Sequence, residues 1–357
     1  MSYLNILSAA EQVADFLRKE LLRGAWTGLM PGSDRLAAEL GVGGNTVEAA
    51  LRLLEKEGLL ESQGRRRGRI IVAPGSGQAG RKLRVAILVG EDADRRLEYM
   101  VKLEHGLLEA GHKAFHLTQT LLGEFGMDVD RVAKMVKKTP ADAWILVGAS
   151  REVLAWFCEQ STPAIAIFGR RRGLPMAGVG PDKSPACTSA ARVLIGLGHR
   201  RIVWLARKMR RLPVPGALER AFLNELAAQG IPPGPYHLPD WEESIDGFHE
   251  RLESLFRVTP PTALIIDEAP FFVAALQFLA GRGLRVPEDV SLICTDADAT
   301  FAWCRPSVAH IRWDSRPVVR RVLRWAANIS RGQVDLRQTL TPAEFLQGGT
   351  IGPVAKG

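Results

Sequence analysis

The chain has 357 residues, 46% of them hydrophobic, and a formal net charge of +8. This apolar content is typical of a packed globular protein and excludes a disordered one, and no apolar run approaches the roughly 18 residues that span a bilayer. The chain is too long for a small DNA-binding module alone and has room for a second domain of ordinary to large size. The positive charge is compatible with a nucleic-acid partner.

The four cysteines give no indication of metal chemistry. They stand at positions 158, 187, 294 and 304, without CxxC pairs and without histidines at ligand spacing. Free thiols in a cytoplasmic protein are therefore expected, with no metal and no cofactor. The first residues also lack the apolar core of a signal peptide, because residues 4–7 form only a short run and Glu11 follows soon after.

A helix is expected first in the chain, over residues 12–22. Ser8 and Glu11 have the spacing of a capping box, in which each side chain accepts a hydrogen bond from the backbone N–H of the other residue. This pair is expected to begin the helix.

Residues 28–72 predict a helix-turn-helix followed by a β-wing. Leu36 and Leu40 lie one helical turn apart in the first helix. The second helix has apolar residues at i, i+3, i+4 and i+7, namely Val47, Ala50, Leu51 and Leu54. Three glycines within residues 41–44 permit a tight turn between the helices, and such a turn places the second helix where it can enter the major groove of DNA.

The wing is expected to be a hairpin with a basic tip. Residues 59–62 and 69–72 can form two strands, and Gly64-Arg65-Arg66-Arg67-Gly68 makes a glycine-bounded turn between them. An isolated turn of this kind is more often a solvated surface. Beside a helix-turn-helix, however, three arginines suit the phosphates that flank the groove.

These elements resemble the GntR family of winged-helix regulators. The resemblance rests on Leu36-Ala37-x-x-Leu40-Gly41-Val42 and continues through Asn45-Thr46-Val47-x-x-Ala50-Leu51 to Glu57-Gly58-Leu59. It implies a transcription regulator that binds double-stranded DNA. The positions at which the family usually carries DNA-facing arginines are Asp34, Gly44 and Glu48 in this chain, so the family's contacts do not carry over directly.

The DNA contacts are expected from the start of the second helix and from basic residues around it. Asn45 and Thr46 keep a contacting role in the resemblance, although Asn45 is equally suited to cap the helix. Arginines of the helices and the wing can replace the missing positive charge. The candidate DNA-binding residues are Arg35, Asn45, Thr46, Arg52, Arg65, Arg66, Arg67 and Arg69.

A glycine-rich linker over residues 73–82 is expected to separate two domains, residues 1–72 and residues 83–357. Beyond the linker, strand-like and helix-like segments alternate, which predicts an α/β domain with parallel sheets covered by helices on both faces. The expected strands are residues 83–89, 143–147, 164–168, 202–206, 263–266 and 290–294. The expected helices are residues 97–110, 184–197, 218–229 and 271–281.

This second domain resembles the LacI/GalR effector domain, which is similar to periplasmic sugar-binding proteins. Its most specific stretches are residues 179–182, 197–202 and 283–291, which read VGPD, LGHRRI and GLRVPEDVS. Within them Asp182 can cap a helix, Gly198 can end it, and His199 is expected to be structural rather than catalytic. The resemblance implies two lobes that close on a small molecule, and a dimer formed through these lobes. A GntR-type head on this body is known among arabinose regulators, so a sugar is the expected effector.

The effector residues are expected at the carboxyl ends of the strands, where ligands bind in such sheets. Asp296 matches the family's aspartate after the last core strand, and a turn-capping aspartate is an equal alternative. Trp303 is a candidate stacking ring for a sugar, beside Trp241 and Trp313, although such residues are more often in a core or an interface. The candidate effector-binding residues are Asp92, Ser150, Arg170, Asp267, Glu268, Asp296 and Trp303.

Several departures leave the identity of the effector open. The family's usual arginine falls on Leu218, and its usual Asn-Asp falls on Glu268-Ala269. Residues 168–218 also contain eleven lysines or arginines and one acid, Asp182. If these cations face the ligand, they indicate an anionic effector. If they face outward, they form a solvated or DNA-proximal surface, and this second interpretation is preferred.

An enzyme is the less favoured interpretation, because the sequence has no GxxxxGK[ST], GxSxG or HExxH motif and so offers no candidate catalytic residue. The sequence predicts a regulator, expected to be a repressor, of a carbohydrate-utilisation operon. It is expected to bind operator DNA as a homodimer and to respond to a sugar-like effector. The alternative is a sugar-binding α/β protein or enzyme whose head no longer binds DNA specifically.

Overall fold

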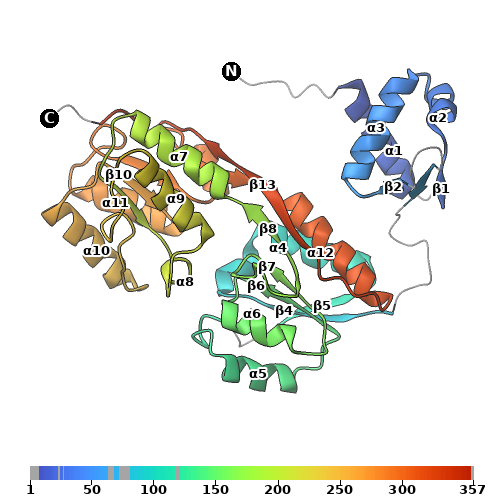
Figure 1. Cartoon of the computed structure of the whole chain (residues 1–357), viewed down its shortest axis with the longest axis horizontal. Coiled ribbons are helices and arrows are strands. Elements are labelled where there is room, and N and C mark those ends of the chain that lie inside the picture. The colour runs from blue at the N-terminus through green and yellow to red at the C-terminus, as the bar shows by residue number, and fades with distance from the viewer. Residues whose placement is uncertain are drawn as a thin grey trace. The chain divides into compact units, whose positions relative to one another are not determined.

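The computed structural model describes residues 8–22, 25–26, 28–62, 68–71, 81–117 and 121–354, with only the backbone at residues 22, 92 and 93. The chain divides into two compact units, one of Met1–Lys82 with Ala327–Gln333 and one of Leu83–Ala326 with Val334–Gly357 (Figure 1). We call residues 8–71 the head and residues 83–354 the body. The predicted wing tip, Arg65 to Arg67, and most of the predicted linker lie outside the described residues. None of the described helices is long and apolar enough to cross a membrane.

Three helices form the core of the head: α1 (Ala9–Leu22), α2 (Ser33–Leu40) and α3 (Gly44–Lys56). The expected capping box is confirmed at the start of α1. Ser8 N–H donates to Glu11 Oε2 at 2.7 Å, and Glu11 N–H donates to Ser8 Oγ at 3.3 Å. This pair sets the start of α1 at Ala9, earlier than the predicted residue 12. The apolar faces of the helices meet in a buried core that includes Leu17, Leu36, Val47, Leu51 and Leu54.

A left-handed glycine and a small sheet complete the head. Gly41 turns the chain between α2 and α3 with φ of +65°, a conformation that residues with side chains rarely adopt. The two predicted wing strands are present as β2 (Leu60–Ser62) and β3 (Arg69–Ile71), which pair antiparallel. A third strand, β1 (Leu29–Met30), pairs with β3 and was not predicted, because two residues carry no periodicity. The head is therefore a winged helix-turn-helix.

The body holds one 10-stranded sheet that spans two lobes. The first lobe has the strand order β5-β4-β6-β7-β8 and the second lobe β12-β11-β10-β9. β13 (Gln338–Leu346) is parallel to β8 and antiparallel to β12, so it joins the lobes (Figure 1). The other strands are β4 (Arg84–Leu88), β5 (Lys113–His116), β6 (Ala143–Val147), β7 (Ala164–Ile167), β8 (Ala177–Asp182), β9 (Ile202–Leu205), β10 (Ala263–Ile266), β11 (Ser291–Cys294) and β12 (Ala309–Trp313).

Helices cover both faces of each lobe, as the alternating pattern predicts (Figure 1). In the first lobe α5 (Val129–Lys138) and α6 (Arg151–Cys158) pack against one face of the sheet, and α4 (Glu98–Glu109) and α12 (Ser315–Ser330) lie together. A Cβ on Gly106 of α4 would lie 2.7 Å from Leu323 Cδ1 of α12, so the glycine leaves room for this leucine side chain between the two helices. In the second lobe α7 (Ser184–Gly196) and α9 (Ala217–Ala228) cover one face, and α10 (Ile245–Val258) and α11 (Ala269–Gly281) cover the other.

The motif around His199 has the structural role that was predicted. His199 is buried in the second lobe, with Nδ1 3.0 Å from Thr262 Oγ1 and Nε2 2.9 Å from the Gly352 carbonyl oxygen. Burial lowers the pKa of His199, so its imidazole is held neutral. The N-cap of α7 is Lys183 rather than the predicted Asp182, which precedes it and accepts a hydrogen bond from Ser184 N–H at 3.1 Å. Gly198, with φ of +95°, follows the end of the helix.

Candidate functional site

The exposed face of α3 is the candidate DNA-reading surface of the head. It lies opposite the buried residues of the helix and presents Asn45, Ala49 and Arg52 to solvent, with Thr46 and Glu48 partly exposed. The N-cap of α3 is Gly43, and Asn45 lies inside the helix. The alternative role of Asn45 as an N-cap is therefore wrong, and its side chain remains available for a base contact.

Three of the predicted DNA-binding arginines have carboxylate partners within the head. Arg35 pairs with Glu39 at 2.8 Å and Arg52 with Glu48 at 3.6 Å. Both arginines are exposed, so these pairs contribute under about 1 kcal/mol and can be exchanged for phosphate contacts. Arg69 differs, because it is mostly buried and bonds two carboxylates.

Arg69 joins the wing to α3. Its Nη2 and Nη1 donate to the two oxygens of Glu48 at 2.6 and 3.2 Å, and its Nε donates to Glu55 at 2.8 Å. The hydrogen bonds from Arg69 lower the pKa of Glu48, so this carboxylate stays ionised. In the described head, Arg69 therefore fixes the wing strand on the recognition helix.

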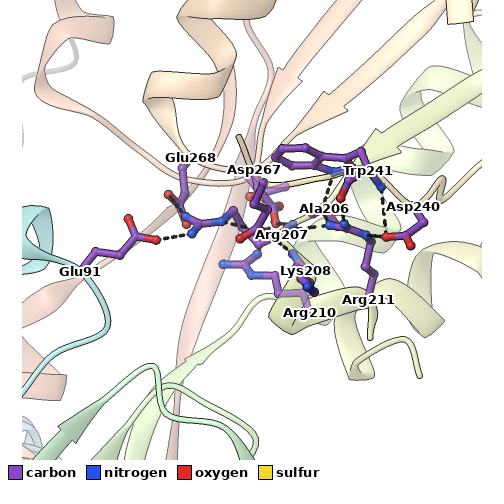
Figure 2. Close-up of polar contacts among 12 residues, drawn as sticks. Glu91, Ala206, Arg207, Lys208, Arg210, Arg211, Asp240, Trp241, Asp267 and Glu268 are labelled. Atoms are coloured by element: carbon purple, nitrogen blue, oxygen red, sulfur yellow. Dashed lines mark hydrogen bonds and ion pairs between the residues drawn. The ribbon is translucent and has the colours of Figure 1, made fainter. Parts of the chain in front are cut away.

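The second candidate site is a network of charged side chains at the carboxyl ends of the strands of the second lobe (Figure 2). Its centre is Asp267, which follows β10 and is 0% exposed. Asp267 Oδ1 accepts hydrogen bonds from Trp204 Nε1 at 3.0 Å and Thr295 Oγ1 at 2.8 Å, and lies 3.3 Å from Arg210 Nη1. Asp267 Oδ2 accepts from the backbone N–H of Arg207 at 2.8 Å. The carboxylate thus anchors the segment after β9 to β10.

Arg207 carries this network across to the first lobe (Figure 2). Its guanidinium donates to Glu268 at 2.8 Å, within the second lobe, and to Glu91, which follows β4 of the first lobe. Its charged group also lies 5.3 Å from the centre of the Phe271 ring. Because this arginine bonds carboxylates of both lobes, it links them directly.

Two further cations bridge segments at the same edge of the sheet. Arg170, which follows β7 of the first lobe, donates to three carbonyl oxygens of the second lobe, at 3.0 Å (Met209), 2.8 Å (Arg210) and 2.9 Å (Val214). Lys183, at the end of β8, bonds Asp296 and also donates to the Thr295 carbonyl oxygen at 3.1 Å. The charge of Lys183 is thus balanced by Asp296, whereas the donors of Arg170 are satisfied by carbonyl oxygens. These two cations contact the protein's own acceptors, so the preferred interpretation of an outward-facing surface is wrong for them.

Tyr99 Oη and Glu219 Oε1 are among the buried oxygens that have no hydrogen-bond partner within the residues that the structure describes. Burial, with Asp94 and Asp296 nearby, raises the pKa of Tyr99, so its hydroxyl keeps a proton to donate. Because Asp94 belongs to the first lobe and Asp296 to the second, Tyr99 lies where the lobes meet. Its ring packs against Phe168 and Trp313, with centroids at 5.6 and 5.9 Å.

Glu219 lies on α9, in the position that follows the family's missing arginine. Burial raises the pKa of Glu219 to about 7, although the positive charge of Arg210 opposes the rise. Sequence reasoning identified neither Tyr99 nor Glu219. The family comparison at Leu218 was the nearest signal, since it pointed to an altered ligand surface one residue away.

The other predicted effector residues are distributed around this edge. Ser150 caps α6, where its Oγ accepts from Val153 N–H at 3.3 Å. Trp303 is 88% exposed on a short helix, η2 (Ala299–Trp303). Asp92 lies in η1 (Asp92–Arg96), and its side chain is outside the described part of the chain. Within that part, no group of His, Cys, Asp and Glu has the arrangement of a metal site.

A winged helix-turn-helix joined to a two-lobed α/β body defines a class of two-domain transcription regulators. Comparison with family models supports both halves. Residues 9–70 match the model for bacterial regulatory proteins of the gntR family, and residues 191–351 match the model for the periplasmic binding protein-like domain. The head is thus similar to gntR-family DNA-binding regulators and the body to periplasmic binding proteins, and the predicted resemblance is confirmed.

Solved structures share the fold over most of the chain. The transcriptional regulator CelR in complex with cellobiose is 19% identical and has a TM-score of 0.62, over 90% of this chain and 100% of that chain. A LacI family regulator from Mycobacterium smegmatis is 20% identical and has a TM-score of 0.60, over 75% of this chain and 99% of that chain. A LacI family regulator from Enterococcus faecium with bound ribose is 16% identical and has a TM-score of 0.58, over 76% of this chain and 99% of that chain. At these identities the similarity establishes the fold. No curated protein sequence matches the chain.

Proposed function

We propose that the protein represses a carbohydrate-utilisation operon and leaves its operator when a small polyhydroxylated effector binds between the two lobes. The observation that carries the proposal is that one chain combines a gntR-like head with a body whose lobes meet at buried polar groups without partners among the described residues. Similar folds bind cellobiose in CelR and ribose in the Enterococcus faecium protein, which supports a sugar. A regulator of chromosomal genes works in the cytoplasm, with residues 1–72 as its DNA-binding domain and residues 83–357 as its sensor.

The chemistry of the lobe edge favours a neutral polyol over an anion. Arg170, Lys183 and Arg207 already have carbonyl or carboxylate acceptors, so an anionic ligand would have to displace them. The acceptors Asp296 and Glu268 and the donor Tyr99 match the hydroxyl groups of a sugar, and the rings of Phe168 and Trp313 match its apolar faces. We therefore place the effector against Tyr99, Glu219, Glu268 and Asp296.

A homodimer is part of the proposal, because a regulator with one recognition helix per head reads an inverted repeat as a pair. The exposed apolar residues Leu97, Val101 and Leu108 lie on or beside α4 and offer a surface on which the body can pair. In the dimer the effector would favour one lobe arrangement, and so change the spacing of the two heads relative to the operator half-sites.

DNA footprinting tests the regulator function. The full-length protein is expected to protect an inverted repeat upstream of its own gene or of a neighbouring sugar-utilisation operon, with two protected half-sites. Cellobiose, ribose or another sugar from a panel is expected to abolish the protection. If no sequence is protected even at low salt, where phosphate contacts are strongest, the alternative of a sugar-binding protein without specific DNA binding is favoured. Asp34 and Glu48 on the head are the observations that support that alternative.

The replacement Tyr99→Phe is expected to weaken effector binding by about tenfold or more while leaving the fold as stable as before or more stable. The substitution removes one buried hydroxyl that has no partner in the described structure, and burying such a group costs roughly 1–3 kcal/mol. The same hydroxyl is the proposed donor to the effector. Thermal shift with the sugar that releases DNA measures both quantities.

Tyr236→Phe is the matched control, because the Tyr236 hydroxyl donates to the Thr259 carbonyl oxygen at 3.1 Å within the second lobe. This variant is expected to bind the effector with unchanged affinity and to be slightly less stable. A Tyr99→Phe protein that keeps the full thermal shift would remove Tyr99 from the effector site.

A further inference from the structure

Glu48 occupies the part of α3 that faces DNA in the proposed function. It lies near the N-terminal end of the helix, on the face shared by Asn45 and Arg52 and opposite the buried residues Val47 and Leu51. The N-terminal residues of a recognition helix are those that meet base edges in the major groove. Glu48 is 34% exposed, so its carboxylate is accessible from this face.

The local charges make a carboxylate tolerable at this position. An isolated carboxylate in the groove would be repelled by the phosphates. Here Arg69 contacts both oxygens of Glu48, and Arg52 lies 3.6 Å away on the next turn. Each carboxylate oxygen can accept more than one hydrogen bond, so Glu48 keeps acceptor capacity beyond its contacts with Arg69.

We propose that Glu48 is a specificity-determining residue that accepts a hydrogen bond from the N4 amine of a cytosine in the operator. The proposal rests on the proposed function, because it requires that the head bind DNA. The four bases differ at the major-groove edge. Guanine presents two acceptors, which repel a carboxylate, and thymine presents an acceptor and a methyl group. Adenine presents an amine beside the acceptor N7, whereas cytosine presents the amine without an adjacent acceptor.

Arg69 is the positioning residue for this contact. It holds the Glu48 carboxylate from the wing strand β3, and its bond to Glu55 fixes the guanidinium from a second point on α3. A freely rotating glutamate would lose side-chain entropy on meeting a base, whereas this one is already oriented. The same pair explains how a chain that lacks an arginine at this position can still discriminate between bases.

Selection of DNA from a randomised duplex library, with full-length protein, tests the proposal. The wild-type protein is expected to select a half-site with one cytosine that Glu48→Ala no longer selects, while the other selected positions stay the same. Glu48→Gln is expected to shift the preference toward adenine, which pairs with a glutamine amide, and Glu48→Arg toward guanine. In competition binding at fixed salt, replacing that C·G pair by T·A is expected to weaken the wild-type protein about tenfold, and Glu48→Ala less than about twofold.

Glu61→Ala is the matched control, because Glu61 is an exposed carboxylate of the head that lies on β2 rather than on α3. It is expected to select the wild-type sequence. Arg69→Ala is expected to reduce selectivity at the cytosine position alone. A Glu48→Ala protein that folds, as shown by its melting temperature, and selects the wild-type cytosine overturns the inference and leaves Glu48 as a clamp for the wing. A wild-type protein that selects no sequence overturns the proposed function instead.

Discussion

Replacing Asp267 by alanine is expected to destabilise the body by about 3–5 kcal/mol, the usual cost of removing one partner of a buried charge pair. Asp267 is fully buried and accepts from Trp204 Nε1, Thr295 Oγ1 and the backbone N–H of Arg207. Alanine would leave these donors without their acceptor and would remove the nearest counter-charge of Arg210. Urea unfolding followed by tryptophan fluorescence measures the loss, because Trp204 lies in the affected lobe.

Glu344→Ala is the control for a charge pair at the surface. Glu344 pairs with Arg312 at 2.5 Å and both side chains are more than half exposed, so its removal is expected to cost less than about 1 kcal/mol. Asp267→Asn should fall between the two, since the amide keeps one acceptor oxygen but places an NH₂ group among donors. An Asp267→Ala protein as stable as Glu344→Ala would contradict the role of Asp267 as the anchor between β9 and β10.

The fold was predictable where a single segment carries its own signal. Six buried strands of the body were recognised from short apolar runs, and the start of α1 from the side chains of Ser8 and Glu11. β13 was missed, because its sequence QTLTPAEFL contains a proline and has no clear alternation. Its place is set by two partners far away in the chain, since Thr339 pairs with Val179 and Phe345 with Ile311. Such pairing is decided by the assembled sheet.

The candidate site was predictable only as an edge. The rule that ligands meet the carboxyl ends of parallel strands located Asp267, Glu268 and Asp296 correctly at one edge. The rule could not show that the Asp267 carboxylate already accepts hydrogen bonds within the protein, because the donor groups lie on other elements. Tyr99 was missed for the same reason: it lies on a helix, and only tertiary packing brings its hydroxyl to the place where the lobes meet.

The head shows a similar limit. Comparison with the family identified Glu48 as an acid where an arginine is usual, and this observation alone weakens the expectation of DNA binding. The structure adds that Arg69, which sequence reasoning assigned to DNA, lies against that acid. Whether a charge in a sequence helps or hinders DNA binding therefore depends on a partner 21 positions away.

Replacing Glu219 by glutamine is expected to stabilise the protein at pH 8 by about 3 kcal/mol relative to pH 4.5, because a shift of one pKa unit corresponds to about 1.4 kcal/mol. Burial raises the pKa of Glu219 from 4.5 to about 7. At or below pH 4.5 the group is neutral in the folded protein, so glutamate and glutamine should be nearly equivalent. Between pH 4.5 and 7 the unfolded chain releases the proton while the folded protein retains it, so the wild type loses stability as the pH rises. Glutamine has no proton to release and avoids that loss.

Glu225→Gln, the same substitution on the same helix, gives the opposite sign and serves as the control. Glu225 is hydrogen bonded to Arg192 at 2.8 Å, and this contact lowers the pKa of the Glu225 carboxyl. Its contribution to stability is present at neutral pH and disappears as the pH falls, so Glu225→Gln should be less stable than wild type at pH 8 and similar at low pH. Melting temperatures of the three proteins between pH 4.5 and 8 measure both trends. A Glu219→Gln advantage that does not change over this range would mean that the Glu219 carboxyl is ionised throughout, and its buried Oε1 would then need a cation as its partner rather than a hydroxyl group of the effector.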